Sequence, residues 1–180
     1  MKYESITSSD VNNGLGCRVT LWVSGCTHHC KQCHNRKTWS FSSGKVYNGK
    51  VEEVLFNEID RPYIKGLTLS GGDPLDSPDG VLELLQHFRE RFGNTKDVWI
   101  YTGYTYEKLL TMGEDYTNFL KYIDILVDGP FLIKEKSFDV KFRGSKNQRL
   151  IDVKKTLNNN KIVLYDEEVK QETKKRRMYI

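Results

Sequence analysis

Three of the four cysteines in this 180-residue chain stand within eight residues, at Cys26, Cys30 and Cys33. Their spacing is C-x3-C-x2-C, and it directly follows an apolar run over residues 19–23. Thiolates are soft ligands that select zinc, copper(I) or iron–sulfur clusters. A cubane cluster held by three cysteines keeps one iron without a protein ligand, and that iron can bind a small molecule. The spacing and its context favour a [4Fe-4S] cluster with one open position.

Zinc is the alternative occupant of these thiolates. Structural zinc has four protein ligands, and Cys17, His28, His29 or His34 could supply the fourth. The second half of the usual paired C-x2-C pattern is missing, which favours the cluster over zinc. Cys17 stands in a stretch with strand character, so we interpret it as a buried, inert thiol.

Apolar stretches and amphipathic stretches alternate along the chain. The expected strands are 17–23, 67–69, 98–101 and 123–127, and the expected helices are 50–59, 78–92, 106–112 and 116–122. This alternation indicates an α/β fold with a parallel sheet. A full eight-stranded (β/α) barrel typically needs about 250 residues. The length therefore predicts a partial, open (β/α) barrel with about 4–6 strands in its sheet.

The ends of the chain carry weaker patterns. Residues 1–16 are polar and finish in Asn-Asn-Gly-Leu-Gly, which is a loop composition. Residues 142–152 are expected to form a last loop followed by a strand or short helix, and residues 162–165 an edge strand. The run from Glu167 is expected to be helical or frayed.

Four motifs follow the four expected strands. They are the cysteine motif, Gly71-Gly72-Asp73-Pro74, Thr102-Gly103-Tyr104 and Asp128-Gly129-Pro130. Ligand-binding residues of parallel sheets lie in the loops after the carboxyl ends of the strands. Each of the later three motifs, taken alone, is an ordinary turn. Four motifs on one rim indicate a binding site.

The cysteine spacing resembles that of radical S-adenosylmethionine (SAM) enzymes, and Gly71-Gly72-Asp73-Pro74 matches the place and character of their Gly-Gly-Glu segment. The segments 98–104 and 124–131 look like segments of glycyl-radical-enzyme activases. Together with Arg143-Gly144-Ser145-x-Asn147-Gln148-Arg149, they are most similar to the activating proteins of anaerobic ribonucleoside-triphosphate reductases. The resemblance covers roughly residues 1–152.

The resemblance implies a radical SAM oxidoreductase with a [4Fe-4S] cluster on Cys26, Cys30 and Cys33. The reduced cluster would pass one electron to SAM and give methionine and a 5′-deoxyadenosyl radical. That radical would abstract hydrogen from a glycine α-carbon in the large catalytic subunit of the reductase, whose glycine loop is the substrate. No catalytic residue beyond the cluster is implied. The resemblance also implies a flavodoxin-like or other electron donor.

The implied contacts to SAM fall in three segments: Gln32, Cys33 and His34; Gly71, Gly72 and Asp73; and Thr102. The glycine segment would bind the amino group of SAM through backbone carbonyls, because glycine lets the backbone approach a ligand. The first segment would contact adenine. Here the chain departs from the superfamily, because Gln32 stands where an aromatic residue is common. The Asp128-Gly129-Pro130 motif also lacks the lysine of some activases.

Composition is that of a globular protein, with 38% apolar and 29% charged residues. No apolar run approaches the roughly 20 residues of a membrane span, and the first ten residues lack signal-peptide character. We therefore expect a cytoplasmic protein with no membrane contact. The net charge is only +4, and five cations lie beyond residue 169, so nucleic acid is an unlikely partner.

We expect residues 1–152 to form the radical SAM activase domain, and residues 153–180 to form a C-terminal extension of unknown role with a basic end. Two other functions are compatible with the residues. One is a radical SAM activase of another glycyl-radical enzyme. The other is a zinc-binding interaction module.

Overall fold

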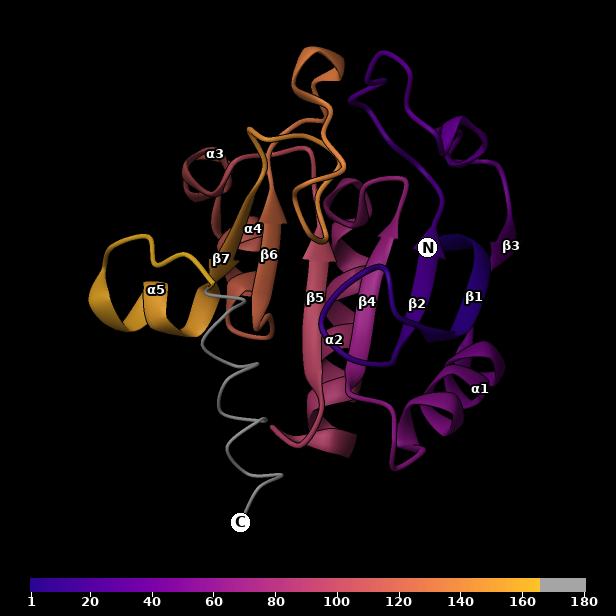
Figure 1. The fold of residues 1–180 in the computed structure, drawn as a ribbon. Helices are drawn as coiled ribbons and strands as arrows, with labels where there is room; N and C mark the ends of the chain where they lie inside the picture. The colour runs from indigo at the N-terminus through magenta and orange to yellow at the C-terminus, as the bar shows by residue number, and fades with distance from the viewer. Residues whose placement is uncertain (166–180) are drawn as a thin grey trace.

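A seven-stranded mixed sheet runs through the structure, a computed structural model that describes residues 1–165 (Figure 1). The strands are β1 (Lys2–Asp10), β2 (Arg18–Val23), β3 (Lys45–Val46), β4 (Gly66–Gly71), β5 (Asp97–Tyr101), β6 (Ile125–Asp128) and β7 (Arg149–Asp152). They lie in the order β3-β1-β2-β4-β5-β6-β7. The expected α/β class is confirmed. The stretch from Glu167 lies outside the described residues.

The middle of the sheet is parallel, as the alternating pattern predicts. β2, β4, β5 and β6 pair side by side in parallel. The helices are α1 (Gly49–Asp60), α2 (Pro78–Phe92), α3 (Tyr106–Leu110), α4 (Glu114–Leu120) and α5 (Val153–Asn159). The first four of them stand between successive parallel strands, which is the βαβ arrangement. Within residues 1–165, no helix combines the length and apolar character that crossing a membrane requires.

Both edges of the sheet are antiparallel, and the N-terminal edge corrects the sequence analysis. β1 pairs antiparallel with β2 and with the two-residue β3, and β7 pairs antiparallel with β6. The loop expected over residues 1–16 was wrong for residues 2–10. Only Tyr3 and Asp10 of β1 are buried, so most of the strand needs no apolar side chains. With these edge strands the sheet exceeds the expected 4–6 strands.

The described chain after β7 is mostly irregular beyond α5. Residues 162–165 were expected as an edge strand, but they form a single antiparallel bridge between Leu164 and Ile151. Two backbone hydrogen bonds flank the bridge, from Asp152 to the Val163 carbonyl and from Tyr165 to the Leu150 carbonyl. This stretch therefore follows β7 without extending the sheet as a regular strand.

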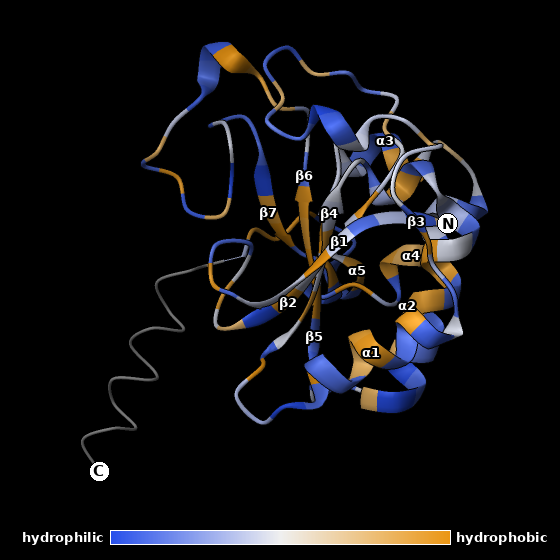
Figure 2. Ribbon diagram, turned by 90° about the vertical axis from the view of Figure 1, so that its right-hand side faces the viewer, coloured by the Kyte–Doolittle hydropathy of each residue, from blue (hydrophilic) through white to orange (hydrophobic). Residues whose placement is uncertain are grey.

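One face of the sheet is covered by helices. Figure 2 shows α1, α2 and α4 together on one side of the strands. Alternate strand residues point to this side and are fully buried: Val19, Leu21 and Val23 of β2, Leu67 and Leu69 of β4, and Val98 and Ile100 of β5. A side-chain period of two places these residues on one face of the pleat. They pack against the apolar faces of the helices and form the main core.

The opposite face of the sheet is covered by loops. Arg18 of β2 is fully buried there and donates to Thr68 Oγ1 at 2.8 Å and to the Asp97 carboxylate. Trp99 of β5 makes edge-to-face contact with Phe142, with ring centroids 5.4 Å apart. Within the described residues, no helix packs on this face. Loops rather than helices therefore bury this face, and its upper part lines the cavity described below.

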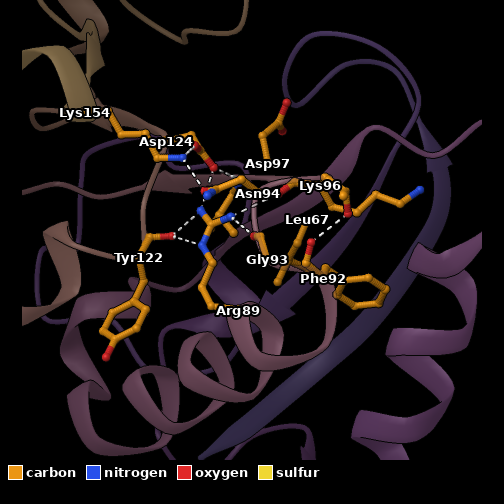
Figure 3. A network of polar contacts seen from close by, with 12 residues as sticks. Leu67, Arg89, Phe92, Gly93, Asn94, Lys96, Asp97, Tyr122, Asp124 and Lys154 are labelled. Atoms are coloured by element: carbon orange, nitrogen blue, oxygen red, sulfur yellow. Dashed lines mark hydrogen bonds and ion pairs between the residues drawn. The ribbon is translucent and has the colours of Figure 1, made fainter.

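Arg89 of α2 ties the amino ends of the central strands together (Figure 3). Its guanidinium donates to the Tyr122 carbonyl at 2.6 Å and to Asp124 Oδ2 at 2.6 Å. It also donates to the carbonyls of Gly93 and Lys96, at 2.9 and 3.0 Å. One side chain thereby satisfies the carbonyls of two turns and the carboxylate that precedes β6.

Asp124 is the charged centre of this network. Burial by itself raises the pKa of Asp124, but hydrogen bonds from Lys154 and Arg89 outweigh it and hold that pKa below its ordinary value of 3.8. The Lys154 ammonium lies 2.7 Å from Asp124 Oδ1. The carboxylate therefore stabilises the fold at neutral pH, and this contribution is lost as the pH falls through the lowered pKa.

We expect Arg89→Ala to lower the free energy of unfolding by about 1–3 kcal/mol, because it removes the donor from several part-buried acceptors. Urea denaturation at pH 7 measures the change. The matched control is Arg91→Ala on the same helix, since Arg91 pairs with the exposed Glu53; we expect about 1 kcal/mol or less. The difference in unfolding free energy between the wild type and Arg89→Ala should become smaller below pH 4, where Asp124 begins to be protonated. Equal effects of the two substitutions would contradict the role of the network.

Candidate functional site

The cysteine motif lies in a long loop after β2, at the upper end of the sheet in Figure 1. The two ends of this loop are joined by backbone hydrogen bonds, from Gly25 to the Thr38 carbonyl at 2.8 Å and from Cys26 to the Trp39 carbonyl at 3.0 Å. Within it, His29 and Gln32 have φ angles of 46° and 60°. These left-handed residues turn the chain sharply between successive cysteines.

The three cysteines of the motif line one cavity of about 340 Å³ at the carboxyl ends of the parallel strands. Each of them is half-buried and forms no disulfide. Burial raises the pKa of Cys26 to about 11, and burial also raises the pKa of Cys30. A metal or cluster binds thiolates, so its binding here must release protons from these thiols. Three soft donors converging on one cavity fit a group that takes three protein ligands.

The glycine turn after β4 lies directly against the start of the cysteine loop. Gly72 donates its N–H to the Val23 carbonyl and Asp73 donates to the Gly25 carbonyl, both at 2.8 Å. A Cβ on Gly72 would stand only 2.2 Å from the Gly25 oxygen, and Gly71 has a φ of 110°. The two glycines are therefore required by the contact between the two loops. Both also line the cavity.

The Asp73 carboxylate joins three loops of the site. Only 2% of Asp73 is exposed, and its Oδ2 accepts from Thr102 Oγ1 at 2.9 Å and from the Gly103 N–H at 2.8 Å. His28 Nε2 lies 2.7 Å from the same oxygen, and Oδ1 accepts from the Leu75 N–H at 2.9 Å. The hydrogen bond between His28 and Asp73 raises the pKa of His28, although burial alone would lower it. Asp73 thus holds the cysteine loop and the loop after β5 against the glycine turn.

Asp76 makes a second connection between the same loops. It accepts a hydrogen bond from the Thr27 N–H at 2.7 Å and another from the Tyr104 hydroxyl at 2.7 Å. The Tyr104 ring also packs against the His28 imidazole, with ring centroids 4.4 Å apart. Five side chains from three loops therefore fix the geometry on one side of the cysteines: His28, Asp73, Asp76, Thr102 and Tyr104.

The loop after β6 forms the opposite wall, and the last predicted motif organises it. Gln148 Oε1 accepts from the Gly144 N–H at 2.9 Å, while its Nε2 donates to the Gly129 carbonyl at 3.0 Å. Asn147 Nδ2 donates to the Pro130 carbonyl at 2.8 Å. The two amide side chains fasten the start of β7 to the Asp-Gly-Pro turn. They give this wall a defined position.

The structure brings most of the predicted site residues together. Besides Cys26 and Cys30, the predicted residues that line the cavity are Cys33, His34, Gly71, Gly72, Asp73 and Thr102. Gln32 does not line it and is exposed. The Thr102 hydroxyl donates to Asp73 and accepts from the Tyr104 N–H at 3.1 Å, so its polar atom is already engaged within the protein.

Several lining residues were not predicted as site residues, although the last four of them stand in segments that carry the resemblance: Asn12, Asn13, Trp22, Phe142, Tyr101, Phe131, Arg143 and Gln148. Trp22 and Tyr101 could have been found from the side-chain period of two, because they alternate with buried helix-facing residues near the ends of β2 and β5. The others come from loops, whose paths over the open face have no periodic signal.

Most of the zinc ligands considered above are badly placed. Cys17 precedes the six residues of β2, so it lies roughly 20 Å from the cysteine loop. His28 Nε2 is paired with Asp73. The His29 ring packs on Trp39, with centroids 4.6 Å apart. His34 alone stands at the cavity without a described side-chain partner, within residues 1–165.

Comparison with known proteins agrees with this site. A family model described as a 4Fe-4S single cluster domain matches residues 12–151. Proteins named anaerobic ribonucleoside-triphosphate reductase-activating protein match most of the chain. The relative from Enterobacteria phage T4 is 39% identical over 154 residues, which is 83% of this chain and 93% of the relative. Relatives from Haemophilus influenzae and Escherichia coli K12 are 41% and 39% identical, each over 82% of this chain and 96% of the relative.

The family-model match begins just after β1 and ends within β7, so it includes the cysteine loop, the glycine turn and the wall after β6. The resemblance inferred from the motifs is thereby confirmed. With a 4Fe-4S single cluster domain spanning its three-cysteine cavity, the chain belongs to the family of anaerobic ribonucleoside-triphosphate reductase-activating proteins.

Proposed function

We propose that this protein generates the glycyl radical of an anaerobic ribonucleoside-triphosphate reductase, using SAM bound at a [4Fe-4S] cluster on Cys26, Cys30 and Cys33. The observation that carries the proposal is the shared cavity, in which three thiols of an activating-protein family member face the Gly71-Gly72 turn. When bound and reduced, the cluster supplies the electron that cleaves SAM to methionine and the 5′-deoxyadenosyl radical.

The protein's part is to bind and orient. Cys26, Cys30 and Cys33 would hold the cluster, and three protein ligands would leave a position at which SAM could bind. The backbone of Gly71 and Gly72 would approach the amino group, and Cys33 and His34, which line the cavity, would contribute to the adenine site. Asp73 and Thr102 act by holding these loops together, because the Thr102 hydroxyl donates a hydrogen bond to the Asp73 carboxylate. No proton transfer by a side chain is required.

The substrate is a protein segment, and the open face of the sheet supports this. We propose that the sheet forms one wall of a partial, radical SAM-type barrel, whose helix-free face admits the glycine loop of the large reductase subunit. Loops at the carboxyl ends of β2, β4, β5 and β6 surround the cavity. A docked glycine loop would complete the enclosure and exclude water from the reacting atoms.

Three further assignments belong to the proposal. A flavodoxin-like or other one-electron donor reduces the cluster. The protein works in the cytoplasm, where a reducing environment keeps its thiols available as ligands. Residues 1–152 form the activase domain, because the family model matches residues 12–151; residues 153–180 are an extension that the proposed activity does not require.

Anaerobic reconstitution with iron and sulfide, followed by dithionite and SAM, tests the proposal. We expect 5′-deoxyadenosine and methionine by chromatography. With the reductase subunit present, we expect a glycyl radical signal in the electron spin resonance spectrum. A parallel sample with an unrelated glycyl-radical enzyme should give no such signal. The proposal would be refuted if the protein bound zinc through four side chains and cleaved no SAM.

A further inference from the structure

A second hollow of about 470 Å³ lies beside the cavity. It is formed by residues 28–31 of the cysteine loop and residues 130–135 of the loop after β6. The two hollows share His28, Cys30 and Phe131. Cys30 therefore borders both of them. One hollow leads to the glycine turn, and the second, called here the outer groove, gives a separate approach to the same cysteine.

The outer groove lies in the most basic part of the described chain. Segments 26–39 and 130–148 contain eight Lys and Arg residues and two acidic residues, a net charge of +6 in a chain whose total is +4. Lys31 and Lys134 line the groove itself and are exposed. Neither forms an ion pair with any residue in the described range 1–165. Glu135 also lines the groove, but the positive charge of the two segments exceeds the negative charge, and this local excess steers an acidic partner toward the groove.

The floor of the outer groove is apolar. Pro130, Phe131, Leu132 and Ile133 line it, and 41% of Leu132 is exposed. A small apolar centre within a charged rim is the composition of a transient protein interface. Complementary charge then sets the rate of encounter more than the final affinity. This combination fits a partner that must bind briefly, react and leave.

We propose that the outer groove is the docking site for an acidic one-electron carrier protein that reduces the cluster through the Cys30 side. This inference rests on the proposed function, because it names the entry point of the electron that function requires. The donor gives up one electron, which the cluster accepts, and no atom or proton is exchanged. SAM and the glycine loop use the first cavity, so the donor and the substrate approach Cys30 from different sides.

The test uses the double variant Lys134→Glu/Lys136→Glu, which reverses two exposed charges and leaves the cysteine loop unchanged. Its matched control is Lys50→Glu/Lys121→Glu, with both exposed lysines on the helix-covered side of the sheet. An acidic flavodoxin is titrated into each protein by calorimetry at low and high salt. SAM cleavage is then driven either by the reduced flavodoxin or by dithionite, which needs no docking site.

We expect the Lys134/Lys136 variant to bind flavodoxin about tenfold more weakly at low salt, with the difference fading as salt rises. Flavodoxin-driven cleavage should fall in parallel, while dithionite-driven cleavage stays at the wild-type rate. Equal flavodoxin affinity in the variant and the wild type would overturn the inference. It would also be overturned if the variant lost affinity for the reductase subunit instead. If the wild-type protein failed to cleave SAM with dithionite, the proposed function would be refuted. The calorimetric titration would still measure whether flavodoxin binds at the outer groove.

Discussion

Alanine in place of Cys26, Cys30 or Cys33 will give a colourless protein after anaerobic reconstitution. Iron content should fall from about four atoms per chain in the wild type to near zero, because two remaining thiolates cannot hold a cubane cluster. The three thiols line one cavity, and His28 and His29 cannot replace one of them because His28 is hydrogen-bonded to Asp73 and His29 packs on Trp39. His34 lines the cavity, but one imidazole does not restore a third thiolate. Iron analysis and the visible absorption spectrum measure the loss.

The matched control for these substitutions is Cys17→Ala. Cys17 precedes β2 and lies at the opposite end of that strand from the cysteine loop. We expect this variant to take up iron like the wild type and to give the same spectrum. If Cys17→Ala also lost its iron, the assignment of the three ligands would be wrong. Retention of the full cluster by any one of the other three variants would refute it as well.

Gly72→Ala should disturb both the fold and the cofactor site. The new Cβ would stand 2.2 Å from the Gly25 carbonyl oxygen, which is backbone and cannot rotate away. Separating the two loops costs about 1–3 kcal/mol of unfolding free energy. Gly25 is joined directly to Cys26, so the displacement also moves a cluster ligand. We expect SAM to bind about tenfold more weakly or worse, measured by equilibrium dialysis.

Gly49→Ala provides the control, because no atom lies within 4 Å of its added Cβ at the start of α1. Its unfolding free energy should be unchanged or higher by up to about 1 kcal/mol, since alanine restricts the unfolded chain. SAM affinity should equal that of the wild type. A Gly72→Ala protein with wild-type stability and wild-type affinity would show that the contact between the two loops does not matter.

The sequence was most informative where residues are buried periodically. The four parallel strands could be predicted because Val19, Leu67, Val98 and their neighbours are apolar in short runs. α2 could be predicted because its apolar face, its first-turn proline and the following Gly93 agree with one another. In each case local preference and burial point to the same element.

Other features lacked such a signal. β1 was not predicted because its sequence is polar. An exposed edge strand is held by backbone pairing, here with β2, and this pairing leaves no apolar pattern in the sequence. The role of Asp73 could be predicted only in part. The motif marked it as a ligand contact, whereas its carboxylate holds three loops together, a role set by side chains such as Thr102 that are distant in sequence. The ion pair between Arg18 and Asp97 on the loop-covered face could not be predicted either, because the two residues are distant in sequence.

The absence of helices from one face of the sheet, within residues 1–165, has a consequence for timing. If the glycine loop of the reductase covers the reactive centre, as proposed, water reaches that centre until the reductase has bound. Productive hydrogen abstraction would then be tied to encounter between the two proteins, and turnover by the solitary protein would consume cofactor without result. Assembly, rather than the supply of SAM, would decide when the radical is made.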